Sequence, residues 1–153
     1  SPDWTLHFSS VNHLLVNNMK VINPSNAPNS DGIDLDCVSN GIVSNSYFSV
    51  GDDALCVKSG IDYNGRKYNR MSQDILFSNI TIGTGHGISI GSETSGGVNN
   101  ITFDSIHMTG THSGPRIKSQ RGRGGVVSNI KYTNIIGRNI KDMLSITLII
   151  IQI

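Results

Sequence analysis

The sequence is poor in residues that build helices and has no segment long enough to cross a membrane. It contains only two alanines, Ala27 and Ala54, and a single glutamate, Glu93. Isoleucine, valine, threonine, asparagine, serine and glycine are common instead, which favours strands joined by turns. No stretch reaches the roughly 20 apolar residues of a bilayer span, so we expect no membrane partner. The net charge of +1 provides no overall positive field that would attract nucleic acid.

The cysteine content is also low. Cys37 and Cys56 are too few for a disulfide framework. They form either one bridge or two small buried thiols, and we favour the thiols.

An internal repeat organises the chain. Five similar segments carry a small polar residue at matching places: Asn18, Asn45, Asn79, Ser105 and Asn134. The intervals are 27, 34, 26 and 29 residues, and the longest contains the insertion GIDYNGRKYNRMSQ. A short strand with period-two alternation follows each segment, in DGIDLD, DALCVKS, GISIGS, PRIKS and LSITL. We expect the matching asparagines to stack as a ladder of side-chain hydrogen bonds.

The small size of the repeat decides the fold class. One unit cannot bury its own apolar face, so units must stack, and parallel stacking predicts an all-β parallel β-helix of about five coils over residues 1–153. A β-sandwich of hairpins is the alternative, disfavoured because Asn-Gly and Asp-Gly turns do not separate adjacent strands. The inward residues of the second strands align as one column: Leu35, Val57, Ile90 and Ile117.

That alignment also groups the polar residues. Asp31, Asp53, His86 and Ser113 stand four positions before the inward residues. Equivalent positions of successive coils lie about 4.8 Å apart, so Asp31, Asp53 and His86 should form one column. Asp52 lies beside Asp53.

Three crowded carboxylates suggest acid–base chemistry. They repel one another, so at least one should hold a proton near neutral pH. A protonated carboxyl beside ionised ones is what hydrolysis of a glycosidic bond needs. Arg116 and Lys118, which point outward beside Ile117, would pair with the carboxylate of an anionic sugar. A Ca²⁺ site is the second interpretation, disfavoured because no closely spaced run of oxygen ligands is present.

Four motifs occur in a characteristic order: NSDG from Asn29, GDD from Gly51, GHG from Gly85 and RIK from Arg116. With them the sequence resembles glycoside hydrolase family 28, the polygalacturonases, up to about residue 148. The resemblance implies a right-handed parallel β-helix, secretion, a monomer, and hydrolysis of α-1,4-galacturonosyl bonds in pectin with inversion. It implies no metal and no cofactor.

The resemblance also implies residue roles. Asp52 would be the general acid, Asp31 and Asp53 would activate water, and His86 would maintain the protonation state of the acid. For substrate binding, Asn29 would support the site, while Arg116 and Lys118 would bind the sugar carboxylate.

Several alternatives stay open at this point. The insertion and the phrases GSETSGGV and RIKSQRGRGG resemble the exo-acting branch of the family. A hydrolase of rhamnogalacturonan or xylogalacturonan, or a carbohydrate-binding β-helix without catalysis, would share the fold. Two glycosylation sequons begin at Asn79 and Asn100; we expect Asn79 to be buried in the ladder and Asn100 to be exposed.

The two ends of the sequence depart from the family pattern. The N-terminal coils of the family are absent, and LIIIQI stands where a sugar-contacting tyrosine is usual. We therefore expect an internal or C-terminally truncated piece of a longer catalytic domain. The apolar final segment LSITLIIIQI is predicted to be aggregation-prone.

Overall fold

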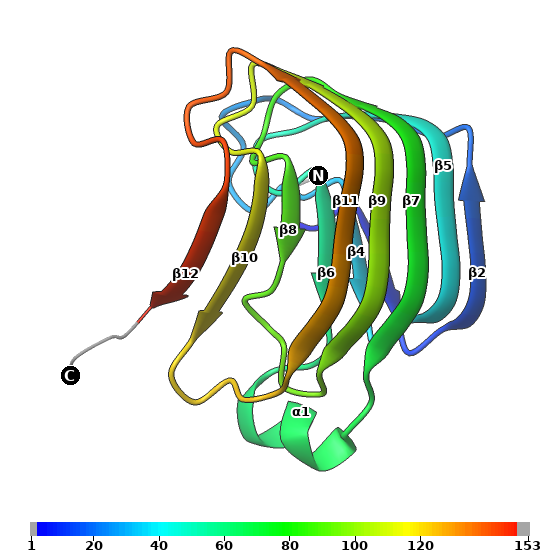
Figure 1. The fold of residues 1–153 in the computed structure, drawn as a ribbon, viewed down its shortest axis with the longest axis vertical. Helices are drawn as coiled ribbons and strands as arrows, with labels where there is room; N and C mark the ends of the chain where they lie inside the picture. The colour runs from blue at the N-terminus through cyan, green and yellow to red at the C-terminus, as the bar shows by residue number, and fades with distance from the viewer. Residues whose placement is uncertain (1–2, 150–153) are drawn as a thin grey trace.

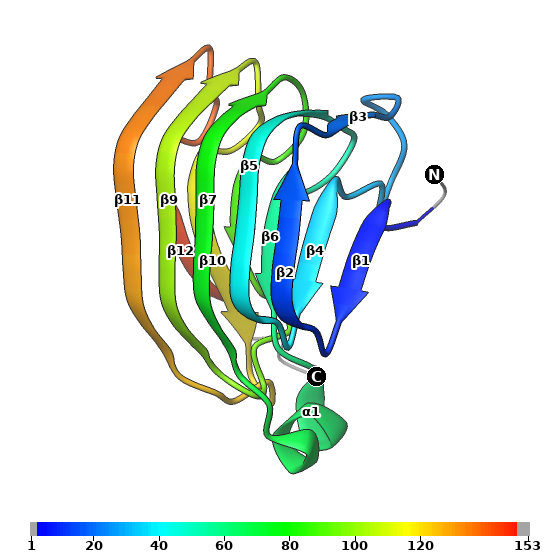
Figure 2. The ribbon, with the colours of Figure 1, turned by 90° about the vertical axis from the view of Figure 1, so that its right-hand side faces the viewer.

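The computed structural model describes residues 3–149, in which the chain passes alternately through two parallel sheets (Figures 1 and 2). The short-strand sheet has the order β1 (Leu6–Ser9), β4 (Ile33–Asp36), β6 (Leu55–Lys58), β8 (Ile88–Ile90), β10 (Pro115–Gln120) and β12 (Ser145–Ile149). The long-strand sheet has the order β11 (Val127–Arg138), β9 (Val98–Thr109), β7 (Ser72–Ile82), β5 (Ser39–Ser49) and β2 (Asn12–Asn17), and β3 (Lys20–Ile22) also pairs with β5. The chain is a right-handed parallel β-helix of about five coils, so the predicted fold class is confirmed and the hairpin sandwich is excluded.

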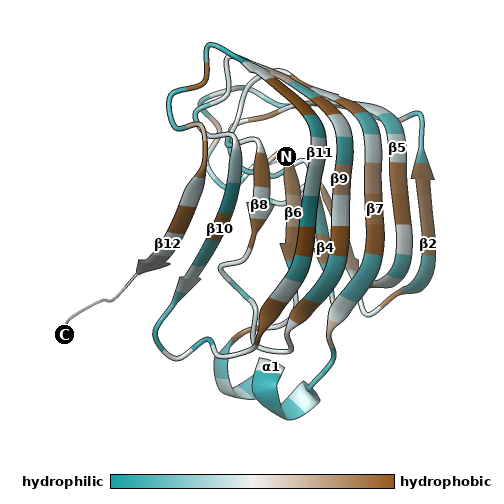
Figure 3. Ribbon diagram, in the orientation of Figure 1, coloured by the Kyte–Doolittle hydropathy of each residue, from teal (hydrophilic) through white to brown (hydrophobic). Residues whose placement is uncertain are grey.

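The interior is built from columns of apolar residues, one from each coil. Leu35 is in register with Val57, Val57 with Ile90, and Ile90 with Ile117. On the long-strand sheet, the ring centroids of Phe77 and Phe103 lie 4.8 Å apart in a stacked arrangement, and Tyr132 continues the stack. Hydrophobic and hydrophilic bands alternate along these strands in Figure 3, as the period of a strand requires. Each buried side chain of this size contributes about 1.5–3 kcal/mol.

The long strands bend at residues with a left-handed backbone. Asn45, Asn79 and Asn134 have φ of 50°, 51° and 53°, a conformation that asparagine tolerates better than most residues. The predicted ladder is present in part: the Asn79 side chain donates to Asn45 Oδ1 at 2.7 Å. Asn45 and Asn134 donate instead to Asn17 and Asp104, the residues just before the predicted Asn18 and Ser105.

A second, unpredicted ladder lies five residues earlier in each coil. Its hydrogen bonds run from Asn40 to Asn12, from Asn100 to Asp74 and from Asn129 to Asn99.

The expected burial of Asn79 is wrong. Both Asn79 and Asn100 are exposed, because the ladders run along the outer surface of the long-strand sheet and not inside the coil. The favoured interpretation of the cysteines is confirmed: Cys37 and Cys56 are both buried free thiols.

The insertion forms a short helix that the sequence did not predict, α1 (Asp62–Tyr68). Its N-cap, Ile61, has no side-chain cap, so the usual signal for a helix start is missing. Gly65 allows the helix to pack closely, because a Cβ there would lie 2.6 Å from the Gly60 carbonyl carbon. No helix within residues 3–149 is long and apolar enough to cross a membrane. The end of the predicted aggregation-prone segment, residues 150–153, lies outside the described residues, as does most of the segment where a tyrosine is usual.

Candidate active site

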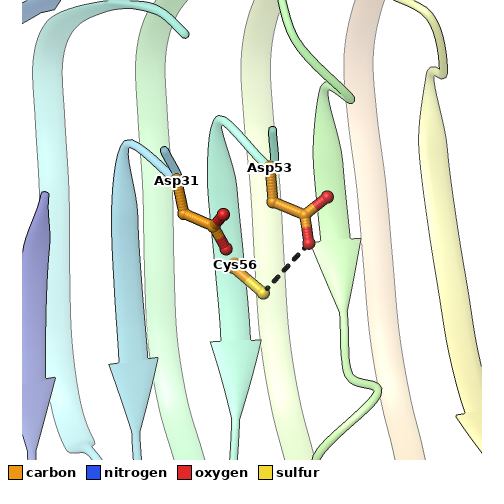
Figure 4. Close-up of side chains that lie close together, drawn as sticks. All are labelled: Asp31, Asp53 and Cys56. Atoms are coloured by element: carbon orange, nitrogen blue, oxygen red, sulfur yellow. Dashed lines mark hydrogen bonds between the residues drawn. The ribbon is translucent and has the colours of Figure 1, made fainter. Parts of the chain in front are cut away.

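Two buried aspartates stand at the entries of neighbouring short strands (Figure 4). The Gly32 N–H donates to the Asp53 carbonyl oxygen at 2.8 Å, which places Asp31 and Asp53 at equivalent positions of adjacent coils. Their residues are 3% and 1% exposed. Gly32 is required here, because a Cβ would lie 2.5 Å from the Ala54 carbonyl oxygen. The Cys56 thiol donates to Asp53 Oδ2 at 3.6 Å, as the dashed line in Figure 4 marks.

Asp52 and His86 form the more accessible part of the same site. Their side chains are 27% and 30% exposed, and His86 Nδ1 lies 2.9 Å from Asp52 Oδ1. The His86 N–H donates to the Asp52 carbonyl oxygen at 2.8 Å, which fixes the two backbones together. Gly85 has φ of +113°, and a Cβ there would lie 2.5 Å from that same carbonyl oxygen. The glycine before His86 therefore allows this close approach.

Asp53 is the most strongly bound carboxylate. Lys118 Nζ lies 2.9 Å from its Oδ2, Arg116 Nη2 pairs with its Oδ1, and the Ser89 hydroxyl donates to Oδ1 at 2.8 Å. Burial alone would raise the pKa of Asp53, but the charges of Lys118 and Arg116 outweigh it and lower the pKa to about 2. The two cations that were predicted to bind substrate thus hold a protein carboxylate in the free chain.

The predicted raised pKa belongs to Asp31. Burial, followed by the negative charges of Asp34 and Asp53, raises the pKa of Asp31 to about 8. Burial also raises the pKa of Asp34 to about 6, against the opposing charge of Lys58. The hydrogen bond with His86, in contrast, lowers the pKa of Asp52. Near neutral pH, the free site therefore holds its proton on Asp31, whereas the family resemblance places the acid at Asp52.

A buried ion-pair network that the sequence analysis missed adjoins these aspartates. Lys58 Nζ lies 3.5 Å from Asp34 Oδ1 and 2.9 Å from Glu93 Oε2. Arg123 extends the network, because it lies 3.7 Å from Glu93 and 2.7 Å from Asp62 of α1. The available signal was the strand register, which aligns Asp34 with Cys56 and Asp36 with Lys58 among otherwise apolar strands.

Asn29 is not brought into contact with the carboxylates. It is exposed, with a left-handed backbone (φ 52°), two residues before Asp31. Among the hydrogen bonds of residues 3–149, none joins its side chain to Asp31, Asp52 or Asp53. Its predicted supporting role stays a prediction.

Two clusters have donor atoms close enough to hold a metal ion. They are Asp31, Asp53 and Cys56, and Asp52, Asp53 and His86, with one atom from each residue within 4.8 Å of the others. Ca²⁺ prefers six to eight oxygen ligands, whereas these clusters include a thiol or an imidazole. Arg116 and Lys118 beside Asp53 also repel a cation. Neither donor set therefore fits Ca²⁺.

Residues 1–149 match the sequence model of Glycosyl hydrolases family 28. The chain belongs to this family. It is 39% identical, over 140 residues, to an endo-polygalacturonase of Pectobacterium carotovorum subsp. carotovorum, a match covering 92% of this chain and 33% of the relative. The family resemblance drawn from the four motifs is confirmed.

Solved structures of polygalacturonases agree with this membership. A polygalacturonase from Erwinia carotovora ssp. carotovora superposes with a TM-score of 0.88 at 34% identity, covering 99% of this chain and 39% of that one. An exopolygalacturonase from Thermotoga maritima gives 0.87 at 29% identity, covering 94% and 34%. The chain spans about a third of the length of the curated relatives that it matches. These relatives include both endo- and exo-acting enzymes, so the exo branch stays a prediction.

Proposed function

We propose that this chain forms the catalytic core of a polygalacturonase, which hydrolyses α-1,4-galacturonosyl bonds of pectin with inversion. The observation that carries the proposal is one arrangement of charges. An accessible carboxyl, Asp52, lies beside a buried carboxylate, Asp53, that holds two partly exposed cations. Because pectin is an extracellular polymer, the proposal includes secretion.

The proposed roles follow from accessibility. Asp52 is the exposed carboxyl, so it is placed to protonate the oxygen of the leaving sugar. Asp31 and Asp53 act on the attacking water, which an inverting enzyme activates with a carboxylate base. His86 touches Asp52 directly and maintains its position and protonation state.

Substrate binding explains how the proton reaches Asp52. Arg116 and Lys118 are 17% and 24% exposed at their side chains, so the carboxylate of a galacturonate unit can reach them. That carboxylate competes with Asp53 for the two cations. When Asp53 shares Arg116 and Lys118 with the substrate, its negative charge is less neutralised. It then repels the negative charge of Asp52 more strongly, which favours the protonated form of Asp52. Asp52 is 27% exposed at its side chain and takes up this proton from water when substrate binds.

The test is the release of new reducing ends from polygalacturonate by the wild-type chain, by Asp52→Asn, and by the matched control Asp104→Asn. Asp104 lies on the long-strand sheet and accepts hydrogen bonds there, as asparagine also can. The proposal predicts release by the wild type and the control, and its loss in Asp52→Asn.

Other outcomes would contradict the proposal. Equal release by Asp52→Asn would refute the assigned acid. Cleavage restricted to rhamnogalacturonan or xylogalacturonan would show that one of these polymers is the substrate in place of polygalacturonate. Saturable binding of polygalacturonate without any cleavage would indicate a binding module.

A further inference from the structure

A hollow of about 440 Å³ lies beside the carboxylates at the N-terminal edge of the short-strand sheet, lined by Asp3, Trp4 and His7. This volume is within the range of roughly 300–1,000 Å³ that is typical of small-ligand sites. The Thr5 N–H donates to the Asp31 carbonyl oxygen at 2.9 Å, and Leu6 pairs with Ile33. Trp4 therefore occupies the position of Asp31, one coil earlier, and extends the column of site residues.

The Trp4 ring is held in place by its neighbours. Lys58 Nζ lies 4.3 Å from the ring centroid, and Lys58 is itself fixed by Asp34 and Glu93. The His7 ring packs at 86° to the indole, with 4.9 Å between centroids, and His7 Nε2 lies 3.5 Å from Asp36 Oδ2. A ring that is already ordered loses little conformational entropy when a ligand binds to it.

We propose that Trp4 and His7 form a subsite for a galacturonate ring, on the opposite side of the catalytic carboxylates from Arg116 and Lys118. The inference rests on the proposed function and extends it. One face of a galacto-configured pyranose carries C3–H, C4–H and C5–H and is apolar, so it packs on an indole. The hydroxyl groups at the rim of the ring meet the imidazole of His7, which is exposed.

The charges around Trp4 define what this subsite recognises. The positive charge of Lys58 is offset by Asp34 and Glu93, and Asp36 adds a further carboxylate beside His7. Asp3, which lines the hollow, is another carboxylate. The Lys58 side chain is 4% exposed, whereas those of Arg116 and Lys118 are 17% and 24% exposed, so a sugar carboxylate reaches the pair Arg116 and Lys118 more easily than it reaches Lys58. It binds the apolar face of the ring, with the sugar carboxylate directed toward solvent.

The two binding regions lie on either side of the carboxylates. Four strand spacings, about 19 Å, separate the backbones of β1 and β10. Their side chains narrow this gap, because Lys118 reaches Asp53 and the Trp4 ring lies over Lys58, both on the coil of β6. A long oligomer anchored at Arg116 and Lys118 therefore passes over the carboxylates and contacts the indole.

Tryptophan emission tests the proposal directly, because Trp4 is the single tryptophan of this sequence. The 153-residue chain carrying Asp52→Asn is titrated with hexagalacturonate. We expect saturable change of the Trp4 emission with the hexamer. In the same background, Trp4→Ala should weaken hexamer binding, measured by calorimetry, about fivefold to tenfold, and Trp4→Phe should restore most of the loss. Tyr63→Ala, on the exposed face of α1, is the matched control and should have no effect.

The proposal is overturned if saturating hexamer leaves the emission unchanged, or if Trp4→Ala and Trp4→Phe bind the hexamer as tightly as the Tyr63→Ala control. Reducing-end release with wild-type Asp52 is measured in parallel. Hydrolysis with unchanged emission would refute the subsite alone, whereas an emission change without hydrolysis would support the subsite and refute the hydrolase.

Discussion

The outer surfaces of the two sheets use the same stacking of coils in opposite ways. On the long-strand sheet, successive coils place asparagines at or next to the same position, so Asn79 donates to Asn45, and Asn45 donates to Asn17, which is in register with Ser44. On the short-strand sheet, successive coils place different residues at one position, and Asp31, Asp53 and His86 follow one another. The first surface is exposed, whereas the second buries Asp31, Asp34 and Asp53 almost completely.

Chemistry accounts for this difference. An amide has both donors and an acceptor, so identical asparagines can satisfy one another along a ladder. Stacked carboxylates repel one another and need cations from other coils, which Lys58, Arg116 and Lys118 provide. The short-strand sheet, where successive coils carry different residues, is thus the surface that can bind an anion and move a proton. Four variants and one change of pH test this difference between the two surfaces.

The largest effect is expected for Asp52→Asn. Loss of a general acid lowers the rate about 10²–10⁴-fold, while the free energy of unfolding should change by less than about 1 kcal/mol, because the side chain is 27% exposed. Initial rates on polygalacturonate and urea unfolding measure both. A loss of rate matched by unfolding would mean that Asp52 is structural.

Asp53→Asn should destabilise the fold by about 3–5 kcal/mol, because it leaves Arg116 and Lys118 beside a buried neutral group. The double variant with Arg116→Gln should recover part of this loss in urea unfolding. A loss below about 1 kcal/mol in Asp53→Asn would show that the ion pairs are not formed.

Lys58→Met should cost about 2–3 kcal/mol at pH 7, because Asp34 and Glu93 lose a buried partner. The cost should be smaller at pH 5, where Asp34, whose pKa is about 6 in the intact site, takes up a proton. A cost that is independent of pH would contradict the network.

Stability should be highest near pH 4–5. Asp31 has a pKa of about 8 in the folded chain against an ordinary 3.8, so its contribution is complete below pH 4 and is lost as the pH rises through 8. Asp53, with a pKa of about 2, contributes above pH 4 and loses that contribution on acidification. With these pKa values, Asp31 alone should lower the free energy of unfolding by about 4 kcal/mol from pH 5 to pH 8. Asp31→Asn should flatten this fall, and an unchanged slope would refute the raised pKa.

The smallest effect belongs to the ladder. Asn79→Ala should cost about 1–2 kcal/mol, from one hydrogen bond and from alanine in a left-handed backbone. Asn79→Gly also removes the hydrogen bond, but glycine adopts the left-handed backbone without strain. It should therefore lower the free energy of unfolding by less than Asn79→Ala does, as measured by urea unfolding. Equal costs for the two variants would mean that the backbone conformation does not contribute.

The repeat predicts the coils because stacked units force equivalent residues into register. It therefore predicts the core column of Leu35, Val57 and Ile90, and the same spacing places Asp31, Asp53 and His86 in one column. The helix α1 was not predicted, because its start at Ile61 carries no capping side chain and it depends on the contact of Gly65 with Gly60, although Asn69 caps its C-terminal end in a left-handed conformation.

The role of Lys58 was equally hidden. Its partners Asp34 and Glu93 are 24 and 35 residues away in sequence, and only the folded chain shows that both face the same ammonium group. The preference of the proton for Asp31 over Asp52 was hidden for the same reason, since it depends on burial and on the position of His86.

The most direct test of the proposed active site is the anomeric form of the newly released reducing end, followed by proton NMR in the first minutes of polygalacturonate cleavage. A carboxylate base acting on water opposite the leaving group predicts the β-anomer first, with the α-anomer appearing only through mutarotation. Release of the α-anomer first would contradict the single-displacement mechanism and the roles assigned to Asp31, Asp52 and Asp53.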